Sequence, residues 1–552
     1  LRLSGQADIY AYLFYHAAAL LKEGGRMGIV TSNAWLDVAY GVELKRFFLN
    51  HFKIVAVVAS WCEPWFEDAA INTAFVILER CEDAEQRNSN IVRFVKVKKP
   101  LAELLPQDLL LREAERWQKV DALVRVIETA DARITAWDPT TGQVQSLCGI
   151  HTVETDAFRI RLVPQSELEA ELTTKGETAK WGLYIRAPQV YFDILAQAGA
   201  RLVPLNRVAY VRRGYTTGIN DFFYLEPLEP KSAPGTLRVK NARGWEGEIE
   251  EECLRPVIKS PKEAAGLVVE PQKLRYRLFL PPVNPSSPDP HRELQNRYPL
   301  AYEYVKWGEQ QRTSQGQSWS HVPSVKGRKA WWLLGERNPS SFLTMGFIDR
   351  RFFVLENAGV LASDVMFEWD FRDPSMFGLS MSLVNSTLTY LLLEMLGRQN
   401  LGDGVLKIIG PELNALLIPD PSIICDTDRE KIAKAYEKLK KREVMQIDRE
   451  VKQKDRRALD EAVLAALGLE PDRYLPDIYE GLVEMVKERL ALPKLRAARQ
   501  KREKGLSLEQ IKEKIRREGL SGGLKPITAF LPAGRPKMMD VALTGRPVSW
   551  RD

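Results

Sequence analysis

Features that mark several common functional classes are missing from this 552-residue chain. Its five cysteines form no Cys-x-x-Cys pair, so neither a zinc knuckle nor a disulfide framework is predicted. Its five histidines are scattered, and none has the i, i+4 partner of a helical metal site. No apolar run approaches the roughly 18 residues that crossing a membrane requires, and no signal-peptide pattern opens the chain. We therefore expect a cytoplasmic protein with no metal site and no membrane segment.

Cofactor-binding glycine loops are also missing. No Gly-x-Gly-x-x-Gly follows a predicted strand near the N-terminus, and the phosphate-loop pattern Gly-x-x-x-x-Gly-Lys-Ser/Thr does not occur. Gly24, Gly25 and Gly28 follow a predicted helix instead. A loop that cradles a cofactor lies between a strand and a helix N-terminus, where backbone amides face the ligand. These glycines therefore predict the end of a helix.

The formal net charge of +6, from 79 Lys and Arg against 73 Asp and Glu, permits a nucleic-acid partner without requiring one. Residues 491–552 hold 15 Lys and Arg against 6 Asp and Glu, so they contribute +9 and the rest of the chain −3. This basic excess favours contacts with phosphates. Because roughly the last thirty residues are rich in Gly and Pro, a solvated, partly disordered tail is an equal alternative.

The N-terminal region has the pattern of an α/β protein. Helical spacing over 7–23 is followed by an apolar strand, a second helix and two further strands, at 27–31, 42–52, 53–60 and 72–78. Continuous apolar runs are typical of a sheet covered on both faces. A strand over 91–97 and a helix over 109–132 come next, in a segment that we interpret as a connector.

The remainder of the chain changes character twice. Short strands, aromatic residues and Gly/Pro/Asn/Ser turns predict a loop-rich α+β domain, which ends with a helix over 380–396. An Ala-, Leu-, Glu- and Lys-rich segment over 426–503 then predicts two or three helices, with breaks at Gly468, near Pro471 and at Pro493.

The N-terminal region also contains segments found in a known family, in a matching order: Asp8–Phe14, Leu20–Leu36, Tyr40–Gly41, Phe66 and Asn72–Leu78. They resemble the back half of an adenine-specific DNA methyltransferase of the TaqI-like class, found in restriction-modification and phage-defence enzymes. Further segments are more loosely similar to the target-recognition domains of that class: Arg212–Tyr224, Leu383–Ser386, Gly402–Lys407 and Leu413–Pro419.

The resemblance implies a domain organisation. It makes residues 1–82 the back half of a Rossmann-like class I methyltransferase sheet, followed by a connector, an α+β target-recognition domain, a helical region and a partly disordered basic tail, at 83–160, 161–421, 422–505 and 506–552. The implied activity is transfer of a methyl group from S-adenosylmethionine to the adenine amino group in double-stranded DNA.

The chain departs from that family in two respects. The family binds S-adenosylmethionine through a glycine-bearing loop after its first strand, and it holds the target amine with an Asn/Asp-Pro-Pro-Tyr/Phe tetrapeptide. Neither is present at the matching positions. We therefore expect no catalytic or cofactor-binding residue in this chain, and we expect upstream sequence or a separate chain to supply the front half of the methylase. The alternative is a non-catalytic specificity subunit that joins a separate methylase chain.

Two adjacent aromatic residues, Trp65 and Phe66, lie in a polar loop ahead of the strand predicted over 72–78. A methylase must extrude its target base from the duplex, and an aromatic ring that stacks on the extruded base recovers part of the unstacking energy. The resemblance places Phe66 at the family's base-stacking position, whereas Trp65 is a neighbour that braces it. The alternative is that both rings cover the end of the sheet.

Basic and hydroxyl-bearing turns are the candidate DNA contacts, because Arg pairs with guanine and phosphate and Thr reaches several base edges. The candidates are Arg212, Arg213, Tyr215, Thr216, Thr217, Arg398 and Lys407, with loops over 314–329 and 398–407 of similar character. The alternative for each is an ordinary surface turn. Paired acids such as Asp364 with Glu368 suggest a nuclease, but they lack the accompanying Lys of that motif, so we interpret them as solvated acids.

Overall fold

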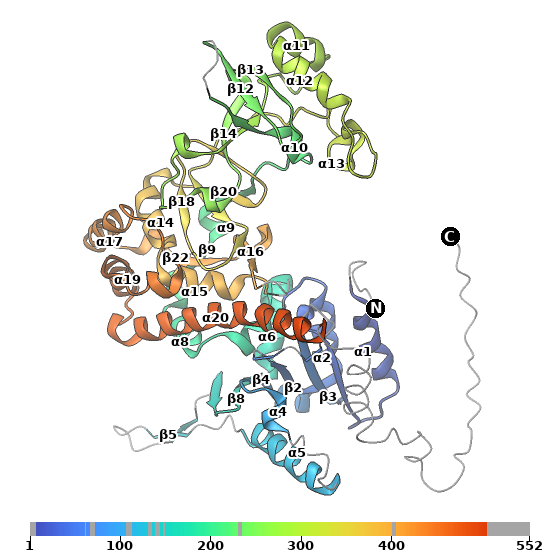
Figure 1. Cartoon of the computed structure of the whole chain (residues 1–552). Helices are drawn as coiled ribbons and strands as arrows, with labels where there is room; N and C mark the ends of the chain where they lie inside the picture. The colour runs from blue at the N-terminus through green and yellow to red at the C-terminus, as the bar shows by residue number, and fades with distance from the viewer. Residues whose placement is uncertain are drawn as a thin grey trace, which may run out of the picture.

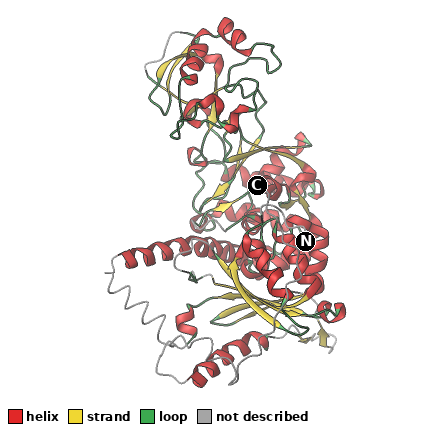
Figure 2. Ribbon diagram, turned by 90° about the vertical axis from the view of Figure 1, so that its right-hand side faces the viewer, coloured by secondary structure: helices red, strands yellow, loops and turns green. Residues whose placement is uncertain are grey.

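The computed structural model describes residues 7–60, 62–63, 65–66, 72–105, 113–130, 135–137, 144–146, 150–229, 234–399 and 404–504. They form a mixed α/β protein with several sheets, as the sequence predicts. A six-stranded sheet lies at one end of the molecule, a second sheet with its own helices forms the opposite lobe, and a helical layer lies between them (Figures 1 and 2).

The first sheet contains the predicted N-terminal strands. Its strand order is β1–β3–β2–β4–β8–β7; β2 and β4 are parallel and the other pairs antiparallel. In this order the strands span Arg26–Ser32, Thr73–Arg80, Phe52–Ser60, Ile91–Val97, Phe158–Pro164 and His151–Glu154. The strands predicted over 27–31, 53–60, 72–78 and 91–97 are therefore confirmed.

Helices cover one face of this sheet through a core that includes Phe14, Phe48 and Trp181. These helices are α1 (Ile9–Ala19), α2 (Gly41–His51), α6 (Gln165–Lys175) and α7 (Gly182–Arg186). On the opposite face, α4 (Leu101–Leu104) and α5 (Glu113–Glu128) pack against Val95 and Ile160. The expected cover on both faces does not extend to the edge strand β1, where Val30 is 41% exposed.

The sheet continues beyond residue 82. Strands β4, β7 and β8 come from the segment interpreted as a connector over 83–160, and β4 pairs directly with β2. No residue of β2 is exposed, so the backbone N–H and C=O groups along its second edge need a partner strand. That segment therefore builds the sheet as well as linking it to the middle of the chain.

The middle of the chain forms two larger sheets, besides two-stranded ones. One has the order β10–β20–β16–β18, spanning Ala209–Arg213, Met366–Phe371, Phe342–Met345 and Val354–Glu356. The other has the order β13–β12–β11–β15–β14–β19, spanning Glu246–Glu250, Thr236–Lys240, Tyr224–Pro227, Tyr276–Phe279, Leu254–Ile258 and Leu361–Ala362. This second sheet and its helices form the upper lobe of Figure 1: α10 (Asn220–Phe223), α11 (Pro290–Arg297), α12 (Pro299–Glu309) and α13 (Pro323–Lys326).

The single helix predicted over 380–396 is wrong. Two helices, α14 (Phe377–Val384) and α15 (Thr387–Leu396), meet at an angle of 79°. The Asn385 side chain between them bonds to both the N–H and the C=O of Val354, each at 2.9 Å, and so competes with helical bonding. The hydroxyl of Ser386 then caps α15. Apolar periodicity is the same on both sides of such a break, so it does not reveal the bend.

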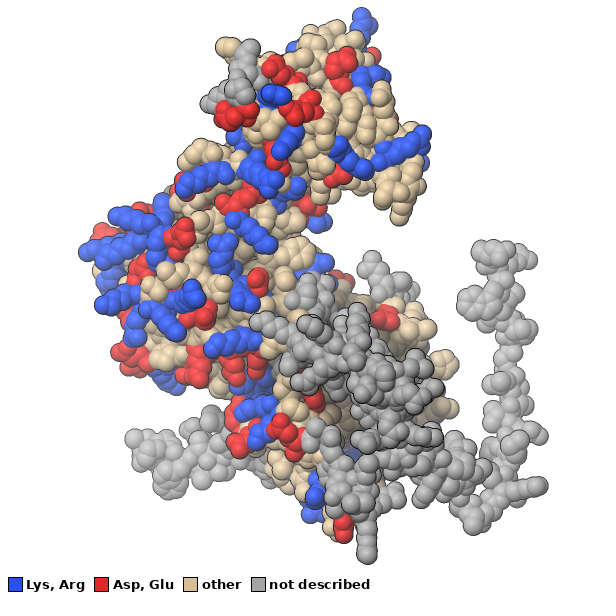
Figure 3. All heavy atoms as spheres, viewed as in Figure 1, with Lys and Arg blue, Asp and Glu red and all other residues tan. Residues whose placement is uncertain are grey.

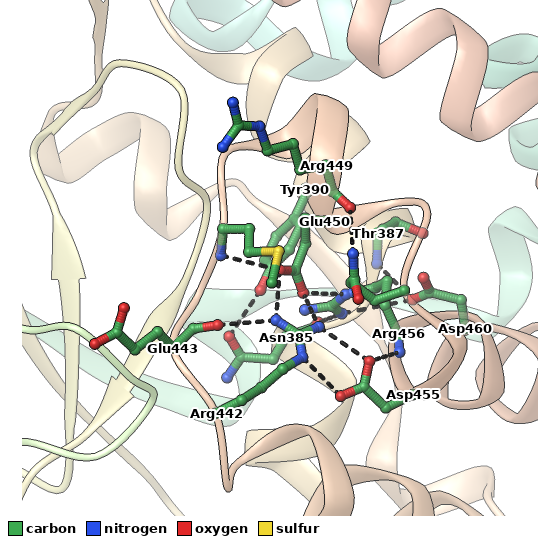
Figure 4. A network of polar contacts seen from close by, with 12 residues as sticks. Asn385, Thr387, Tyr390, Arg442, Glu443, Arg449, Glu450, Asp455, Arg456 and Asp460 are labelled. Carbon is green, nitrogen blue, oxygen red and sulfur yellow. Dashed lines mark hydrogen bonds and ion pairs between the residues drawn. The ribbon is translucent and has the colours of Figure 1, made fainter.

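A buried ionic network holds this break in place (Figure 4). The fully buried Arg456 donates to the carbonyl of Asn385 and, at 3.0 Å, to Glu450, and Arg442 binds the same carboxylate at 2.8 Å. Burial opposes ionisation of Glu450, but Arg442 and Arg456 hold its pKa below the ordinary value. Asp460 accepts the backbone N–H of Thr387 at 2.8 Å. The charges of this network compensate one another, which marks it as structural.

The network belongs to the helical region, where the structure has α17 (Asp426–Leu439), α18 (Ile447–Glu450), α19 (Lys454–Ala466) and α20 (Pro471–Lys504). The break predicted at Pro493 is wrong, because α20 continues through it. α20 connects the first sheet to the middle of the chain: Glu488 pairs with Lys96 of β4 at 2.5 Å, and Arg489 pairs with Glu394 of α15 at 2.9 Å. These contacts stabilise the helix beyond what its sequence predicts.

No single helix among the described residues is long and apolar enough to cross a membrane; only the bent pair around Asn385 passes that test, on length and composition alone. Most residues of α14 and α15 are buried in the core. The basic tail predicted over 506–552 lies outside the described residues.

Candidate nucleic-acid interface

Trp65 and Phe66 differ in exposure. The Trp65 ring packs partly buried against the cluster around Val95 and Ile160, on the sheet face that α5 covers. The neighbouring Phe66 is 49% exposed. Their positions fit the two roles assigned from the sequence, in which Trp65 braces the loop and Phe66 presents a ring to a base. Both roles remain predictions.

The predicted contact residues Arg212 and Arg213 lie at the end of β10, and both are paired with acids. Arg212 Nε donates to Glu368 Oε2 at 2.7 Å, and Arg213 Nε donates to the carbonyl of Asp364 at 2.8 Å. Glu368 is fully buried. The interpretation of this acid as solvated is therefore wrong; it is the buried partner of an arginine.

The side chains of Tyr215 and Thr217 face inward. Tyr215 is 5% exposed, donates its hydroxyl to the Gly335 carbonyl at 3.0 Å and lies 4.0 Å beneath the Arg337 guanidinium; burial raises its pKa. Thr217 is 2% exposed and donates to Asn220 Oδ1 at 2.5 Å. These two side chains brace the turn, because neither is open to a ligand in this conformation. Thr216, between them, is exposed.

The turn depends on glycine. A Cβ atom at Gly214 would lie 2.0 Å from the Ser363 carbonyl oxygen, so only glycine fits. Arg328, in the loop predicted over 314–329, donates to the carbonyls of Thr216 and Thr217, each at 2.9 Å. The tertiary structure therefore joins two candidate DNA-contacting segments that are about a hundred residues apart in sequence.

Arg398 and Lys407 close a short ribbon. Their backbones exchange hydrogen bonds of 2.9 and 3.0 Å, and Arg398 Nε donates to Glu412 at 2.6 Å. Strand β21 (Leu406–Lys407) pairs with β17 (Phe347–Ile348), and Lys407 Nζ lies 5.9 Å from the centre of the Phe347 ring. Phe347 is 42% exposed, and the sequence-based predictions missed it. No sequence signal distinguishes it from the buried Phe352 and Phe353 nearby.

A cavity of about 330 Å³ brings these separate candidates together. Its lining includes Arg212, Arg213, Phe347, Asp364 and Lys407. The molecular surface is hollowed where α13 faces the region of α16 (Gly410–Asn414), so the upper lobe overhangs a concave side of the molecule (Figures 1 and 3).

The ribbon is also anchored to the first sheet and its helices. Asn72, just before β3, donates to the Gln399 carbonyl at 3.2 Å, and Lys180 pairs with Glu412 at 2.7 Å. Arg186 pairs with Asp37 at 2.7 Å. Burial opposes ionisation of Asp37, but Arg186, Lys180 and Lys45 hold its pKa below the ordinary value. The first two contacts join the start of β3 and the segment just before α7 to the ribbon that bears Lys407.

The segment after β1 offers no glycine cradle for a methyl-donor cofactor. After β1 the chain enters the short helix η1 (Asn33–Leu36), in which Trp35 is buried, and a Cβ atom at Gly41 would lie 1.9 Å from the Trp35 carbonyl oxygen. That glycine serves packing and leaves no cradle for a ligand. Among the residues that the structure describes, no group of three His, Cys, Asp or Glu side chains is placed to hold a metal ion.

Two segments of the chain match models of known protein families. Residues 2–66 match the family model of the Eco57I restriction-modification methylase. Residues 269–457 match the model of the C-terminal domain of type II methyltransferase M.Eco57I. The chain resembles a restriction-modification methyltransferase.

Two solved structures are similar to this methyltransferase-like chain at low sequence identity. The type IIG restriction endonuclease BpuSI aligns at 13% identity and a TM-score of 0.40, covering 89% of this chain and 50% of its own. The type IIL restriction-modification enzyme MmeI, solved in complex with DNA, aligns at 10% identity and a TM-score of 0.41, covering 87% of this chain and 53% of its own. The chain thus spans about half the length of both.

Proposed function

We propose that this chain is part of a site-specific DNA methyltransferase that transfers a methyl group from S-adenosylmethionine to the amino group of adenine, in a restriction-modification or phage-defence system. The observation that carries the proposal is the exposed Phe66 ring beside a sheet whose sequence matches a methylase family. An exposed ring at that place is available to stack on an extruded adenine, whereas its neighbour Trp65 packs against the sheet.

The proposal assigns DNA contacts to the residues whose side chains are exposed or half-buried. Arg213 at the end of β10 and Thr216 in the following turn are exposed, and Lys407 and Arg398 of the ribbon are half-buried. Tyr215 and Thr217 hold the turn in shape, because they are buried. Arg212 has a mixed role, since it is 40% exposed and also neutralises the buried Glu368.

The methyl donor and the tetrapeptide that holds the target amine belong, in this proposal, to polypeptide outside the described residues. The exposed side of α1 is the surface on which we place this additional polypeptide. Ile9, Leu13 and Leu20 of the α1 region are 78%, 55% and 88% exposed, while Phe14 on its other side is buried. A helix that is apolar all round is normally covered on all sides. Strand β1 forms one edge of its sheet among the described residues, and an edge strand can pair with a further chain.

A non-catalytic specificity subunit that joins a separate methylase chain is the second candidate. The same exposed side of α1 supports it, because either arrangement covers that surface. The two differ in where the cofactor loop is encoded. In-frame sequence directly upstream of Leu1 that contains a glycine loop and an Asn/Asp-Pro-Pro-Tyr/Phe tetrapeptide favours a single methylase chain, and a separate reading frame favours a subunit.

Isothermal titration of this chain with S-adenosylmethionine tests the proposal first. We expect no binding by this chain alone, and binding once the polypeptide that carries the tetrapeptide is added. Transfer of a tritiated methyl group to adenine in duplex DNA by that assembly, but not by either part, completes the test. Tight binding of the cofactor by this chain alone would contradict the proposed division of the site.

A further inference from the structure

The ribbon formed by β17 and β21 presents an exposed aromatic ring next to a half-buried cation. Phe347 and Lys407 are direct partners in the ribbon, and the ammonium lies 5.9 Å from the ring centre. The next residue, Ile348, is fully buried, so the backbone that carries Phe347 is held firmly. The ring is therefore exposed at a rigid position.

Phe347 also lies where two cavities meet. It lines the cavity of about 330 Å³ that contains Arg213 and Lys407, and a second cavity of about 460 Å³ that contains Lys262, Arg350 and Arg351. A third, of about 250 Å³, shares Arg350 and Gln446 with the second and adds Lys487. Phe347 is common to the first two cavities, and Arg350 and Gln446 are common to the second and third; we call these three adjoining cavities together the ribbon groove.

The ribbon groove is basic. Its lining contains seven Lys and Arg side chains and three Asp side chains. Two of these acids already lie close to an arginine: Asp364 to Arg213 at 3.5 Å and Asp349 to Arg350 at 3.8 Å. An excess of cations along a groove attracts a polyanion, and an aromatic side chain within it adds van der Waals contact with a sugar of the backbone.

We propose that the ribbon groove binds the backbone of duplex DNA, and that Phe347 packs against a nucleotide between phosphates held by Lys407 and Arg213. This inference rests on the proposed function, since it names the surface that the DNA occupies. It differs from the base-stacking role of Phe66, because Phe347 lies on the ribbon, more than 250 positions further along the chain, and contacts DNA that stays paired.

The test measures fluorescence anisotropy of the full chain with a fluorescein-labelled duplex of about 30 base pairs and mixed sequence, over a series of salt concentrations. We expect Phe347→Ala to weaken binding a few-fold, because a paired base cannot stack on the ring and only its packing against the sugar is lost, and Phe347→Tyr to restore most of the affinity. Lys407→Gln should reduce the slope of log affinity against log salt by about one. Ile423→Ala is the matched control, since Ile423 is 48% exposed and does not line the groove.

The outcomes separate this inference from the proposed function. If the wild-type chain binds the duplex and Phe347→Ala and Lys407→Gln leave both affinity and salt slope unchanged, the ribbon groove is not the DNA surface, while DNA binding itself stands. If the wild-type chain binds no duplex at low salt, both fail. Stronger binding to a single strand of the same length than to the duplex also overturns the inference. Circular dichroism of each variant confirms folding; should Phe347→Ala misfold, Lys407→Gln alone decides.

Discussion

The buried network around Arg456 and the ribbon groove use the same residue types in opposite ways. In the network, Arg442 and Arg456 share the carboxylate of Glu450, and side chains and backbone groups from three helices and the break before α15 are tied together. In the groove, cations outnumber acids and one side opens to solvent. Compensated charge holds a fold in place, whereas uncompensated charge at a surface is available to a ligand. Substitutions in the two regions should therefore affect different properties of the protein.

The largest expected effect is on stability, from Arg456→Ala. This change leaves Glu450, which is 1% exposed, with only one of its two arginines and opens a void, so we expect a loss of about 3–5 kcal/mol in the free energy of unfolding. Urea denaturation followed by circular dichroism measures it. Its neighbour Arg457 is exposed and pairs with Glu461, so Arg457→Ala is the control and should change stability little. Equal losses in the two variants would contradict the structural role of the network.

The next effect is on methyl transfer, from Phe66→Ala. Loss of a ring that stacks on the extruded base should lower the transfer rate about 10-fold to 100-fold, corresponding to roughly 1–3 kcal/mol, with little change in melting temperature. Trp65→Ala should lower the melting temperature and change the transfer rate little, because the Trp65 ring packs against the sheet. Both are measured by tritiated-methyl transfer in the assembly that supplies the cofactor loop. Unchanged transfer by Phe66→Ala would exclude the stacking role.

Substitutions of the two adjacent arginines at the end of β10 should affect different properties, namely stability for Arg212 and DNA binding for Arg213. Arg212→Ala leaves the fully buried Glu368 with only the more distant Arg337, at 3.6 Å, so we expect a loss of about 1–3 kcal/mol in unfolding free energy. Arg213 faces the partly exposed Asp364, so Arg213→Ala should leave the free energy of unfolding unchanged. The same change should weaken duplex binding and lower the slope of log affinity against log salt. Thermal melting and anisotropy on both variants make the comparison. If Arg213→Ala leaves affinity and salt slope unaltered, the turn does not contact phosphates.

The smallest expected effect is on pH dependence. Although burial opposes ionisation of Asp37, Arg186 and its neighbours hold the pKa below 3.8. A carboxylate with a lowered pKa contributes stability that is present above the unfolded-state pKa and is lost as pH falls through the folded-state pKa. Asp37→Asn should therefore be less stable than wild type at about pH 6, with a difference that shrinks below about pH 4. Urea titrations across this range measure it; a constant difference would mean that the carboxylate charge is not involved.

Local pattern accounts for the features that the sequence predicted well. The apolar runs of β1 to β4 need no partner information to be recognised as strands, since burial on a pleated surface dictates their composition. The contrast between Trp65 and Phe66 came from a family resemblance, and the exposures agree with it. The break at Asn385 and the continuation of α20 through Pro493 were missed, because both depend on contacts with distant residues.

The sequence by itself determined that this is a mixed α/β protein without a cofactor-cradling glycine loop near its N-terminus, and which turns are basic. Those properties follow from residue type and spacing along the chain. Only the tertiary structure decided that Tyr215 and Thr217 face inward, that Glu368 neutralises Arg212, and that Phe347 lies beside Lys407 in one groove. Each of these depends on strands and loops that are far apart in sequence, and packing alone determines which of their side chains stay exposed.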